Sequence, residues 1–585
     1  MRVRFHVRII AIHRDVSNHT MQSVVTEQIP VRVFTTSMRR IIILILSVLS
    51  PLVSAAAARP NILFILSDDH SYPFIHCYGR EEMKTPNLDR FAAEGIMCRR
   101  MFTGAPQCVP SRATIMTGRS PVAARITRFS SPLSRDEITF PEILRKDAGY
   151  FVGCLGRTYH LDGSGKVPDA TAAAFEENHM LTFKERFNFV DATGQDNVPA
   201  KMNEFFDQRP KDQPYFLWVG FSDPHHPWNT GKNPPDPAKL KVPGFLPDLP
   251  GVRSDLSAYE GEIEHCDGDF QRVLDIVKER AGLENTLVIF MGDNGMAFPS
   301  GKGTLHDPGL NVPLLAWWPG VIKPGGDSSA LISGEDIAPT CLEAAGLPVP
   351  DRISGVSFMP LLKGEPFPKE RKHIFAERGP HGSVTYDEKT TASGVDYSRC
   401  VRSRDYKLIY NVTPNMRYTP VDSANDPVWK DIVKAHEEQQ LASEFETLWF
   451  TSPRAVYELY DLKADPSELH NLYGQKGLED VTMELKTALQ KKMILDFDYL
   501  PLPIAPDEKG GGKGKARSKA DPKRADMFRK LDADHDGKLS KAEFSVKRPA
   551  AEADIWFTAR DANKDGSLDE AEYTAATVPN APKKK

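Results

Sequence analysis

The stretch NILFILSDD at residues 61–69 is a continuous apolar run that ends in two aspartates. A second stretch, TLVIFMGDN at residues 286–294, repeats this pattern and ends in an aspartate and an asparagine. Unbroken apolar runs of this length are typical of parallel strands that are buried on both faces. Ligands of open α/β sheets collect outside the carboxyl ends of the strands, so we expect the two polar pairs to meet there. The two stretches therefore predict an α/β fold with a binding site at one edge of a parallel sheet.

The residues at these two strand ends are Asp68, Asp69, Asp293 and Asn294. Carboxylate and amide oxygens are the ligands that Ca²⁺ and Mg²⁺ prefer. The alternative is that Asp68 and Asp293 only cap the helices that follow, which would explain either residue alone. Both strand ends together, with a reactive residue on a third loop, favour a metal site.

That third loop contains the pentapeptide Cys108-Val109-Pro110-Ser111-Arg112. Proline suits the first position of a helix, so the pattern predicts a helix that begins at Pro110. Cys108 would then lie at the helix N-terminus, where free backbone amides attract anions. Arg112 would follow one turn later on the same side and offer donors suited to an oxyanion. The pentapeptide indicates an anion site that contains a reactive sulfur, unless Cys108 is a buried structural cysteine beside a surface arginine.

Three further segments place cations or imidazoles close to the ends of apolar runs. The run at 215–221 leads to Asp223-Pro224-His225, and a stretch that ends at Leu155 leads to the segment 156–160. The third segment, at residues 298–304, follows the second polar pair and contains Lys302. A single histidine usually only makes structural hydrogen bonds, and a single lysine is usually a solvated surface group, so neither alone indicates catalysis. Taken together, however, the segments give the candidate catalytic residues Arg157, His160, His225 and Lys302.

These motifs together resemble the type I sulfatases, which depend on a formylglycine residue, and the resemblance covers about residues 59–500. It extends to the heparan N-sulfatases, also called sulfamidases, through Asp223-Pro224-His225 and Phe298-Pro299-Ser300-Gly301. A late motif, Tyr457-Glu458-Leu459-Tyr460-Asp461 with Asp465-Pro466 and Asn471-Leu472, is shared by many sulfatases.

One departure from the family stands in the segment Gly156-Arg157-Thr158-Tyr159-His160. The family usually has Gly-Lys-x-His, with a lysine first and a single residue before the histidine. An arginine fork is not interchangeable with an ammonium group. The resemblance therefore supports His160 better than Arg157.

The resemblance implies a role for each motif. Cys108 is implied to be oxidised to Cα-formylglycine by a maturation enzyme, and Arg112 to be its supporting cation. Of the two geminal hydroxyls of the hydrated aldehyde, one attacks sulfur and the other expels sulfate, whereas a serine would be trapped as a stable ester. A general acid must protonate the leaving group, and His225 is the first candidate, with Lys302 second. The implied ligands of a catalytic calcium ion are Asp68, Asp69, Asp293, Asn294 and the modified Cys108, and Asp69 is also placed to take the proton of the nucleophile.

The resemblance also implies an alkaline-phosphatase-like α/β sandwich with a central mixed sheet, followed by a smaller C-terminal α+β domain. We expect the catalytic domain at residues 59–368 and the C-terminal subdomain at 369–506. Within the subdomain we expect a strand at 404–410 and a helix at 479–496. The segment 507–524 is rich in lysine and glycine and cannot bury a core, so we expect a flexible linker there.

Residues 525–576 carry two segments that fit the twelve-residue EF-hand loop, with glycine at the sixth position of each. Leu539 and Leu568 fill the apolar eighth position, which pairs two such loops. A chance acidic turn is the alternative, but it does not account for two loops in tandem. The module is expected to serve calcium-dependent stability, attachment or partner contact, and a basic tail follows at 577–585. The expected ligands are Asp532, Asp534, Asp536, Lys538 and Glu543 in the first loop, and Asp561, Asn563, Asp565, Ser567 and Glu572 in the second.

Residues 1–58 are expected to be a targeting segment rather than part of the fold. Two arginines precede an apolar run at 41–49 that is too short to span a bilayer comfortably. The small residues that follow suit cleavage by a signal peptidase near Ala58, and a membrane anchor is the alternative. Met38 would make a natural start, so the residues before it are expected to be an over-extension. The mature protein is expected to be periplasmic or secreted.

Composition limits the choice of partners. The net charge of -5 over 585 residues gives no sign of nucleic-acid binding. Seven scattered cysteines predict few disulfide bonds or none. The expected partners are a sulfated carbohydrate substrate and the maturation enzyme, with no stable membrane span. Whether the protein forms a homodimer is left open.

Two function classes remain open at this point. The first is a sulfatase that acts on a sulfated glycan, either on N-sulfoglucosamine of heparan-type chains or on an O-sulfate ester of a sugar or aryl group. The second is a phosphatase or phosphodiesterase of the alkaline-phosphatase superfamily, which generally uses serine or threonine as nucleophile and often two metal ions. Cys108 within Cys-x-Pro-Ser-Arg favours the sulfatase. A calcium-binding scaffold without catalysis would leave the anion site without a purpose.

Overall fold

The computed structural model describes most of the chain from Arg59 to Thr574. The expected targeting segment, the linker as far as residue 521 and the basic tail lie outside the described residues. In the part that is described, no helix combines the length and apolar character needed to cross a membrane. The described ranges are 59–126, 129, 131–158, 160–161, 167, 169–367, 371–381, 388–503, 522–546, 548–561 and 563–574.

A mixed sheet forms the centre of the larger unit, in the strand order β4-β3-β5-β1-β6-β7-β2-β8, with β9 paired to β2. The strands from β4 to β6 are mutually parallel, whereas β7 runs antiparallel to both β6 and β2. The expected apolar runs are β1 and β6, so the predicted mixed α/β sheet is confirmed. The strand bounds are β1 Asn61–Ser67, β2 Ile96–Phe102, β3 Phe151–Gly156, β4 Phe189–Asp191, β5 Tyr215–Gly220, β6 Thr286–Gly292, β7 Asn311–Trp317, β8 Gly326–Ser328 and β9 Ile332–Ser333.

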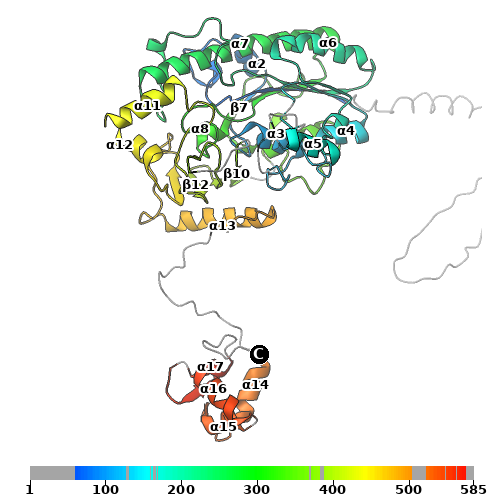
Figure 1. The fold of residues 1–585 in the computed structure, drawn as a ribbon. Coiled ribbons are helices and arrows are strands. Elements are labelled where there is room, and N and C mark those ends of the chain that lie inside the picture. Colours follow the sequence, from blue (N-terminus) through cyan, green and yellow to red (C-terminus); the bar gives the residue numbers. More distant parts are fainter. Residues whose placement is uncertain are drawn as a thin grey trace, which may run out of the picture. The chain divides into compact units, whose positions relative to one another are not determined.

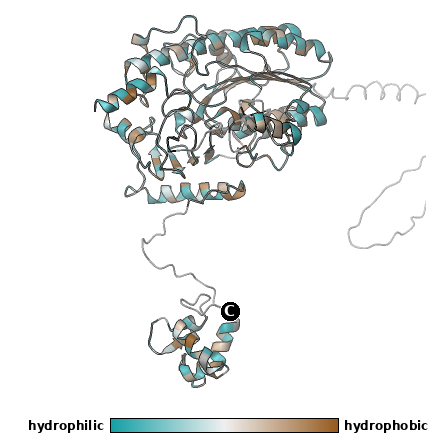
Figure 2. Cartoon of the chain, viewed as in Figure 1, coloured by the Kyte–Doolittle hydropathy of each residue, from teal (hydrophilic) through white to brown (hydrophobic). Residues whose placement is uncertain are grey.

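Helices cover both faces of this sheet because alternate residues of each strand point to opposite sides. In β1, Ile62 and Phe64 pack toward one helical layer, and Leu63 and Ile65 pack toward the other. Figure 1 shows the two layers on either side of the sheet, and in Figure 2 apolar colour runs along the strands while the outer face of α7 is polar. One layer contains α3 Cys108–Thr117, α4 Phe140–Ala148 and α9 Ile337–Ala344, and the other α2 Pro86–Glu94, α6 Val198–Gln208 and α7 Pro250–Arg280.

A second, antiparallel sheet of four strands belongs to the same compact unit, which ends at Pro503. Leu485 and Leu489 of α13 pack against its apolar face. Lys407 of this sheet pairs with two acidic residues outside it: its buried Nζ lies 2.6 Å from Oδ1 of Asp307 and 2.6 Å from Oε1 of Glu468. The elements are β10 Ile374–Arg378, β11 Ser398–Arg402, β12 Tyr406–Asn411, β13 Tyr457–Asp461, α11 Pro427–Glu437, α12 Ser443–Phe445 and α13 Glu479–Leu495, together with α5 Asp169–Glu177, α8 Asp307–Leu310 and α10 Met359–Leu362 elsewhere in the unit.

The second unit, Ile504–Lys585, has a core of its own. Leu539 and Leu568 are directly paired across a short antiparallel ladder, as the eighth positions of two EF-hand loops are expected to be. Phe528, Phe544 and Phe557 pack around this pair. The elements are α14 Pro522–Leu531, β14 Lys538–Ser540, α15 Lys541–Ser545, α16 Ala550–Arg560, β15 Ser567–Asp569 and α17 Glu570–Thr574.

Two expected boundaries need correction. The strand expected at 404–410 begins two residues later, because Ser403 accepts and donates hydrogen bonds that close a turn onto Tyr406. The helix expected to begin at Pro110 begins at Cys108. Pro110 is the third residue of α3, where its missing N–H has no intrahelical acceptor to lose, so the preference for proline still holds. The seven cysteines all lie within the described residues, and none of them forms a disulfide bond there.

Candidate active site

Four neighbouring parallel strands bring the expected site residues to one edge of the main sheet. Along the order β3-β5-β1-β6, Gly156 is in register with Gly220, and Ser67 is in register with Gly292. The loops that follow these strands therefore leave the sheet side by side. They carry Arg157 and His160, then Asp223 and His225, then Asp68 and Asp69, and finally Asp293 and Asn294.

Four oxygen-bearing side chains meet beyond β1 and β6, and all are fully buried: Asp68, Asp69, Asp293 and Asn294. The backbone amide of Asp69 donates to Oδ1 of Asp293 at 3.0 Å, and Nδ2 of Asn294 donates to Oδ1 of Asp69 at 2.8 Å. Burial and the charge of Asp68 raise the pKa of Asp293 to about 7. Oδ1 of Asn294 is buried and accepts no hydrogen bond from the described residues. A crowded carboxylate cluster with an unsatisfied amide oxygen fits a divalent cation such as Ca²⁺.

Cys108 lies against this cluster at the start of α3. Its Sγ is 3.2 Å from Oδ1 of Asp68 and 3.8 Å from Oδ1 of Asp69. Burial and the charge of Asp68 raise the pKa of the thiol well above its ordinary value. Because the thiolate is the nucleophilic form of cysteine, these surroundings do not activate the unmodified side chain.

Two guanidinium groups surround Asp68. Nη2 of Arg112 donates to Oδ2 of Asp68 at 3.0 Å, and Nε of Arg112 donates to Oδ2 of Asp293 at 2.9 Å. Nε of Arg157 lies 2.7 Å from the same Oδ2 of Asp68 and 3.5 Å from Nε2 of His160. Burial raises the pKa of Asp68, but the charges of Arg157 and Arg112 outweigh it and hold this pKa well below the ordinary value. Arg157 thus brings a positive charge into the site although the segment departs from the family pattern.

Lys302 joins the acidic cluster to the histidine loop. Its Nζ lies 2.9 Å from Oδ2 of Asp69, 3.1 Å from Nε2 of His225 and 2.7 Å from Oδ2 of Asp422. Nδ1 of His225 donates to the carbonyl of His226 at 2.5 Å, which leaves Nε2 as the acceptor for Lys302. Burial and the charge of Lys302 lower the pKa of His225 to about 3. The proton between the two side chains therefore sits on Lys302 in this state.

Asp223 fixes the loop that carries His225. Its Oδ2 accepts hydrogen bonds from Nδ1 of His265 at 2.6 Å and from Nε2 of Gln195 at 2.9 Å, and its Oδ1 accepts from Oγ1 of Thr230 at 3.1 Å. Oε1 of Gln195 accepts the backbone amide of Asp223 at 2.9 Å. The sequence motif therefore contributes a loop anchor as well as an imidazole.

Three residues near Lys302 were not among the expected site residues: Gln107, His381 and Asp422. Nε2 of His381 lies 3.8 Å from Oδ1 of Asp422, and Nε2 of Gln107 donates to Nδ1 of His381 at 2.9 Å. Asp422 lies in an irregular segment, and His381 follows the short strand β10, whose three apolar residues do not stand out in the sequence. Gln107 directly precedes Cys108, so the motif around Cys108 could have suggested it as a site residue.

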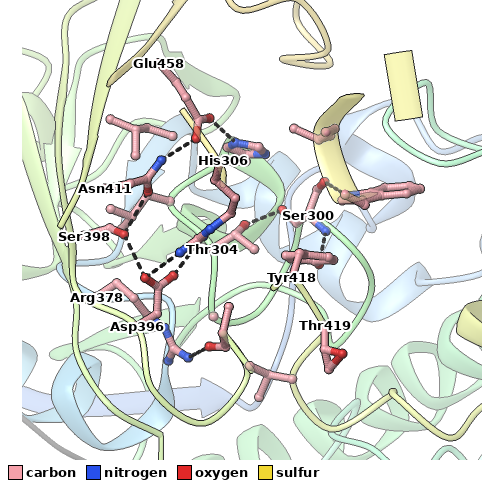
Figure 3. Close-up of a pocket in the computed structure, with 18 of the residues that line it drawn as sticks. Ser300, Thr304, His306, Arg378, Asp396, Ser398, Asn411, Tyr418, Thr419 and Glu458 are labelled. Atoms are coloured by element: carbon pink, nitrogen blue, oxygen red, sulfur yellow. Dashed lines mark hydrogen bonds and ion pairs between the residues drawn. The ribbon is translucent and has the colours of Figure 1, made fainter. Parts of the chain in front are cut away.

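A small cavity of about 50 Å³ includes Lys302 in its lining. Figure 3 shows its side chains linked to one another across the second sheet. Nδ2 of Asn411 donates to Oε1 of Glu458 at 2.5 Å, and Nη2 of Arg454 donates to Oδ1 of Asp396 at 2.8 Å. The chain that follows Lys302 joins this network through Nε2 of His306, which lies 3.4 Å from Oε2 of Glu458 on β13. The second sheet therefore helps to position Lys302.

The first EF-hand loop gathers carboxylates in the second unit. Asp532, Asp534 and Glu543 place ligand oxygens within 4.8 Å of one another. Backbone amides point into both loops, with Gly537 donating to Oδ2 of Asp532 at 3.1 Å and Gly566 donating to Oδ2 of Asp561 at 3.0 Å. This is the backbone arrangement expected of an EF-hand loop.

Comparison with known proteins agrees with this fold. The family model called Sulfatase matches residues 60–347, and the model called N-sulphoglucosamine sulphohydrolase, C-terminal, matches residues 300–449 and 430–494. An EF-hand model matches residues 525–546. The human N-sulphoglucosamine sulphohydrolase is 28% identical over 492 residues, covering 77% of this chain and 93% of the relative. An ulvan-active sulfatase of Formosa agariphila is 28% identical over 480 residues, covering 76% of each chain.

A solved structure, BT4656 in complex with its substrate D-glucosamine-2-N,6-O-disulfate, has the same fold, with a TM-score of 0.55 and 21% sequence identity. It covers 77% of this chain and 100% of that one. The fold is thus alkaline-phosphatase-like, with a buried cluster of carboxylates and cations at the carboxyl edge of its main sheet. The chain belongs to the sulfatase family, and it is a hydrolase of sulfate esters or sulfamates.

Proposed function

We propose that this sulfatase uses Cys108, oxidised to formylglycine, to release sulfate from a sulfated glycan. The observation that carries the proposal is the position of Cys108, 3.2 Å from Asp68 at the N-terminus of a buried helix. The surroundings keep the thiol protonated, so an unmodified cysteine would be a poor nucleophile. The hydrated aldehyde supplies one hydroxyl to attack sulfur and a second that allows sulfate to be expelled.

The side chains around Cys108 suit a sulfo group. Arg112, Arg157 and Lys302 bring three positive charges to a buried anion site, where such charges stabilise developing negative charge more strongly than they would in water. The four oxygen-bearing residues at the strand ends would hold Ca²⁺, which supplies a further positive charge to the sulfo oxygens. Calcium also accounts for the unsatisfied oxygen of Asn294.

Protonation of the leaving group falls to the pair formed by Lys302 and His225. Nζ of Lys302 donates to Nε2 of His225 at 3.1 Å, so the pair shares one proton at the edge of the site. Loss of a proton from Lys302 is opposed by Asp422 and Asp69, which outweigh burial and raise its pKa well above the ordinary value. His225 remains our first choice as the general acid beside the departing atom, and Lys302, which holds the proton in this state, is the second candidate.

The substrate class that we propose is a 2-sulfamino sugar, such as N-sulfoglucosamine at the end of a heparan-type chain. The support is the match of the C-terminal region to the N-sulphoglucosamine sulphohydrolase model and the similarity to the human enzyme of that name. A specific observation favours a second candidate, an O-sulfated sugar. Arg157 replaces the lysine usual in the family and contacts Asp68 directly, which changes the shape of the anion pocket.

The remaining parts of the chain complete the proposal. Residues 1–58 act as a signal segment, so that the mature enzyme is periplasmic or secreted. The domains extend over 59–368, 369–506 and 525–576, and the last of these binds calcium in its two EF-hand loops independently of catalysis.

A screen of sulfate release tests the function. The purified protein is incubated with N-sulfoglucosamine, with glucosamine 6-O-sulfate, with a 2-O-sulfated uronic acid and with nitrophenyl sulfate, phosphate and phosphonate. Preferential release from N-sulfoglucosamine supports the full proposal. Release from O-sulfated sugars alone replaces the substrate class, and preferential cleavage of phosphate or phosphonate contradicts the sulfatase chemistry.

A further inference from the structure

We infer that Asp422 and His381 form a receptor for the hydroxyl group on the carbon next to the one that bears the sulfo group. The inference rests on the proposed function and deepens it, because it states which substrate group the site recognises in addition to the sulfo group. It makes Asp422 a specificity-determining residue that selects a sugar with a free hydroxyl at that position.

The location of Asp422 follows from its contact with Lys302. Nζ of Lys302 holds Asp69 on its inner side at 2.9 Å and Asp422 on its outer side at 2.7 Å. The side chain of Asp69 is 0% exposed, whereas that of Asp422 is 27% exposed. Asp422 thus lies one hydrogen bond beyond the cation that we assign to the sulfo group, on the side that is open to solvent. A group contacted by Asp422 must be a close neighbour of the sulfo group.

His381 provides a donor opposite Asp422. Its Nδ1 accepts a hydrogen bond from Nε2 of Gln107 at 2.9 Å, so the proton of the neutral ring lies on Nε2. Nε2 is 3.8 Å from Oδ1 of Asp422, too far for a hydrogen bond between the two. Burial lowers the pKa of His381 to about 3, which is consistent with a neutral ring. A hydroxyl oxygen placed between them would accept from His381 and donate to Asp422.

The same pair discriminates against a second sulfo group. A sulfo group offers only acceptor oxygens and negative charge, so it would satisfy His381 but meet the carboxylate of Asp422 without a proton to share. A sugar that lacks this hydroxyl would leave Asp422 and His381 without the hydrogen bonds that the hydroxyl makes to them. Sites built to bind a substrate hydroxyl reject analogues that lack it, because their buried polar groups are then left unpaired.

Neighbouring features agree with a contact surface for a sugar. The ring of Phe129 lies 4.6 Å from that of His381 and 5.6 Å from that of His160, which forms an apolar wall between the two imidazoles. Asp422 has a left-handed backbone with φ 66°. Non-glycine residues held in this region cluster at ligand-binding and active sites.

Matched substrates and variants test the inference. The ratio of kcat/KM is measured for N-sulfoglucosamine over its 3-deoxy and 3-O-sulfo analogues, or for the corresponding pair on the neighbouring carbon if an O-sulfated sugar is preferred. For the wild-type enzyme we expect each ratio to be about ten- to hundredfold. In Asp422→Asn and in His381→Phe, the ratio over the deoxy analogue should approach unity. Asp422→Asn should also lower the ratio over the 3-O-sulfo analogue, because it removes the repelling charge.

Asp426→Asn is the matched control, since Asp426 lies on the same segment, is similarly exposed and pairs with His226 at 2.7 Å instead of with Lys302. It should keep both wild-type ratios. Equal kcat/KM for the hydroxyl and deoxy sugars in the wild-type enzyme overturns the inference without any variant. Unchanged ratios in both folded variants do the same. Those results leave the sulfatase function standing, whereas no sulfate release from any sugar overturns the proposed function and this inference together.

Discussion

Sγ of Cys108 lies 3.2 Å from Oδ1 of Asp68, although the two residues are 40 positions apart in the chain. The contact joins the start of α3 to the end of β1, so the reactive residue of one loop touches the acidic cluster formed by others. A side chain oxidised at this position would lie directly beside the residues proposed to hold calcium. The chemistry of Cys108 and the metal site are therefore expected to depend on each other.

Calcium at the strand ends is expected to be separable from calcium in the EF-hand loops. Asp293 is fully buried and is bound by Arg112, so Asp293→Ala should lower sulfatase activity by at least about a hundredfold. It should leave EF-hand calcium in place. Truncation after Pro503, at the boundary of the two units, should remove that calcium and leave activity largely unchanged.

Calorimetric calcium titration and sulfate release on the same samples provide the readout. Asp532→Ala is the control, since it alters a ligand of the first EF-hand loop only. A well-folded truncated protein without activity would contradict the independence of the two calcium classes.

His225 is expected to matter most for substrates with poor leaving groups. A sugar amine needs a proton to depart, whereas a nitrophenolate departs without one. His225→Ala should therefore lower kcat for the sulfated sugar by about a hundredfold or more, and for nitrophenyl sulfate by much less. His226→Ala serves as control, because His226 pairs with Asp426 outside the anion site. Equal losses on both substrates would show that His225 binds the sulfo group without delivering a proton.

Arg157 is expected to resist replacement by lysine, even though lysine is usual in the family. Its Nε contacts both Asp68 and His160, and a lysine ammonium cannot keep this geometry. Arg157→Lys should lower kcat/KM about tenfold or more. Arg99→Lys, in an exposed pair with Asp327, should have no effect. Activity equal to wild type in Arg157→Lys would mean that the site needs only a positive charge.

Stability is expected to fall as pH rises through the pKa of Glu377. Burial outweighs Arg399 and raises this pKa from 4.5 to about 7, so the folded protein holds the proton more tightly than the unfolded chain does. The contribution of Glu377 to stability is complete below pH 4.5 and is lost as pH rises through about 7.

Glu377→Gln keeps an acceptor for the amide of Val122, 2.9 Å away, but does not titrate. Between about pH 5 and pH 8, the fall in Tm should be smaller in this variant by on the order of 1–2 °C. Glu279→Gln, on the exposed side of α7, is the control. An identical fall in wild type and Glu377→Gln would rule out this carboxyl as the source.

The sequence alone located the strands that position the site, since β1 and β6 are unbroken apolar runs of the kind that is typical of buried parallel strands. It also located both EF-hand loops, because glycine and carboxylates recur there at fixed spacing. It placed the start of α3 at Pro110, because proline at a first helical position and at the third look alike without the backbone.

Asp422 and His381 could not be predicted from the sequence, for a different reason. Neither follows a long apolar run, and Asp422 contacts Lys302, with His381 beside Asp422, only because the second sheet packs against the main sheet. A contact made through tertiary packing leaves no periodic trace in the sequence. The same holds for His265, which is one of many polar residues on α7 until the fold brings it to Asp223.

The central claim, formylglycine at residue 108, is tested most directly by the mass of the peptide that contains it, measured on active protein. We expect the mass of a thiol converted to an aldehyde, capture of that aldehyde by a hydrazide, and loss of both turnover and capture in a folded Cys108→Ser variant. An intact thiol in fully active enzyme, or sustained wild-type turnover by Cys108→Ser, would contradict the account.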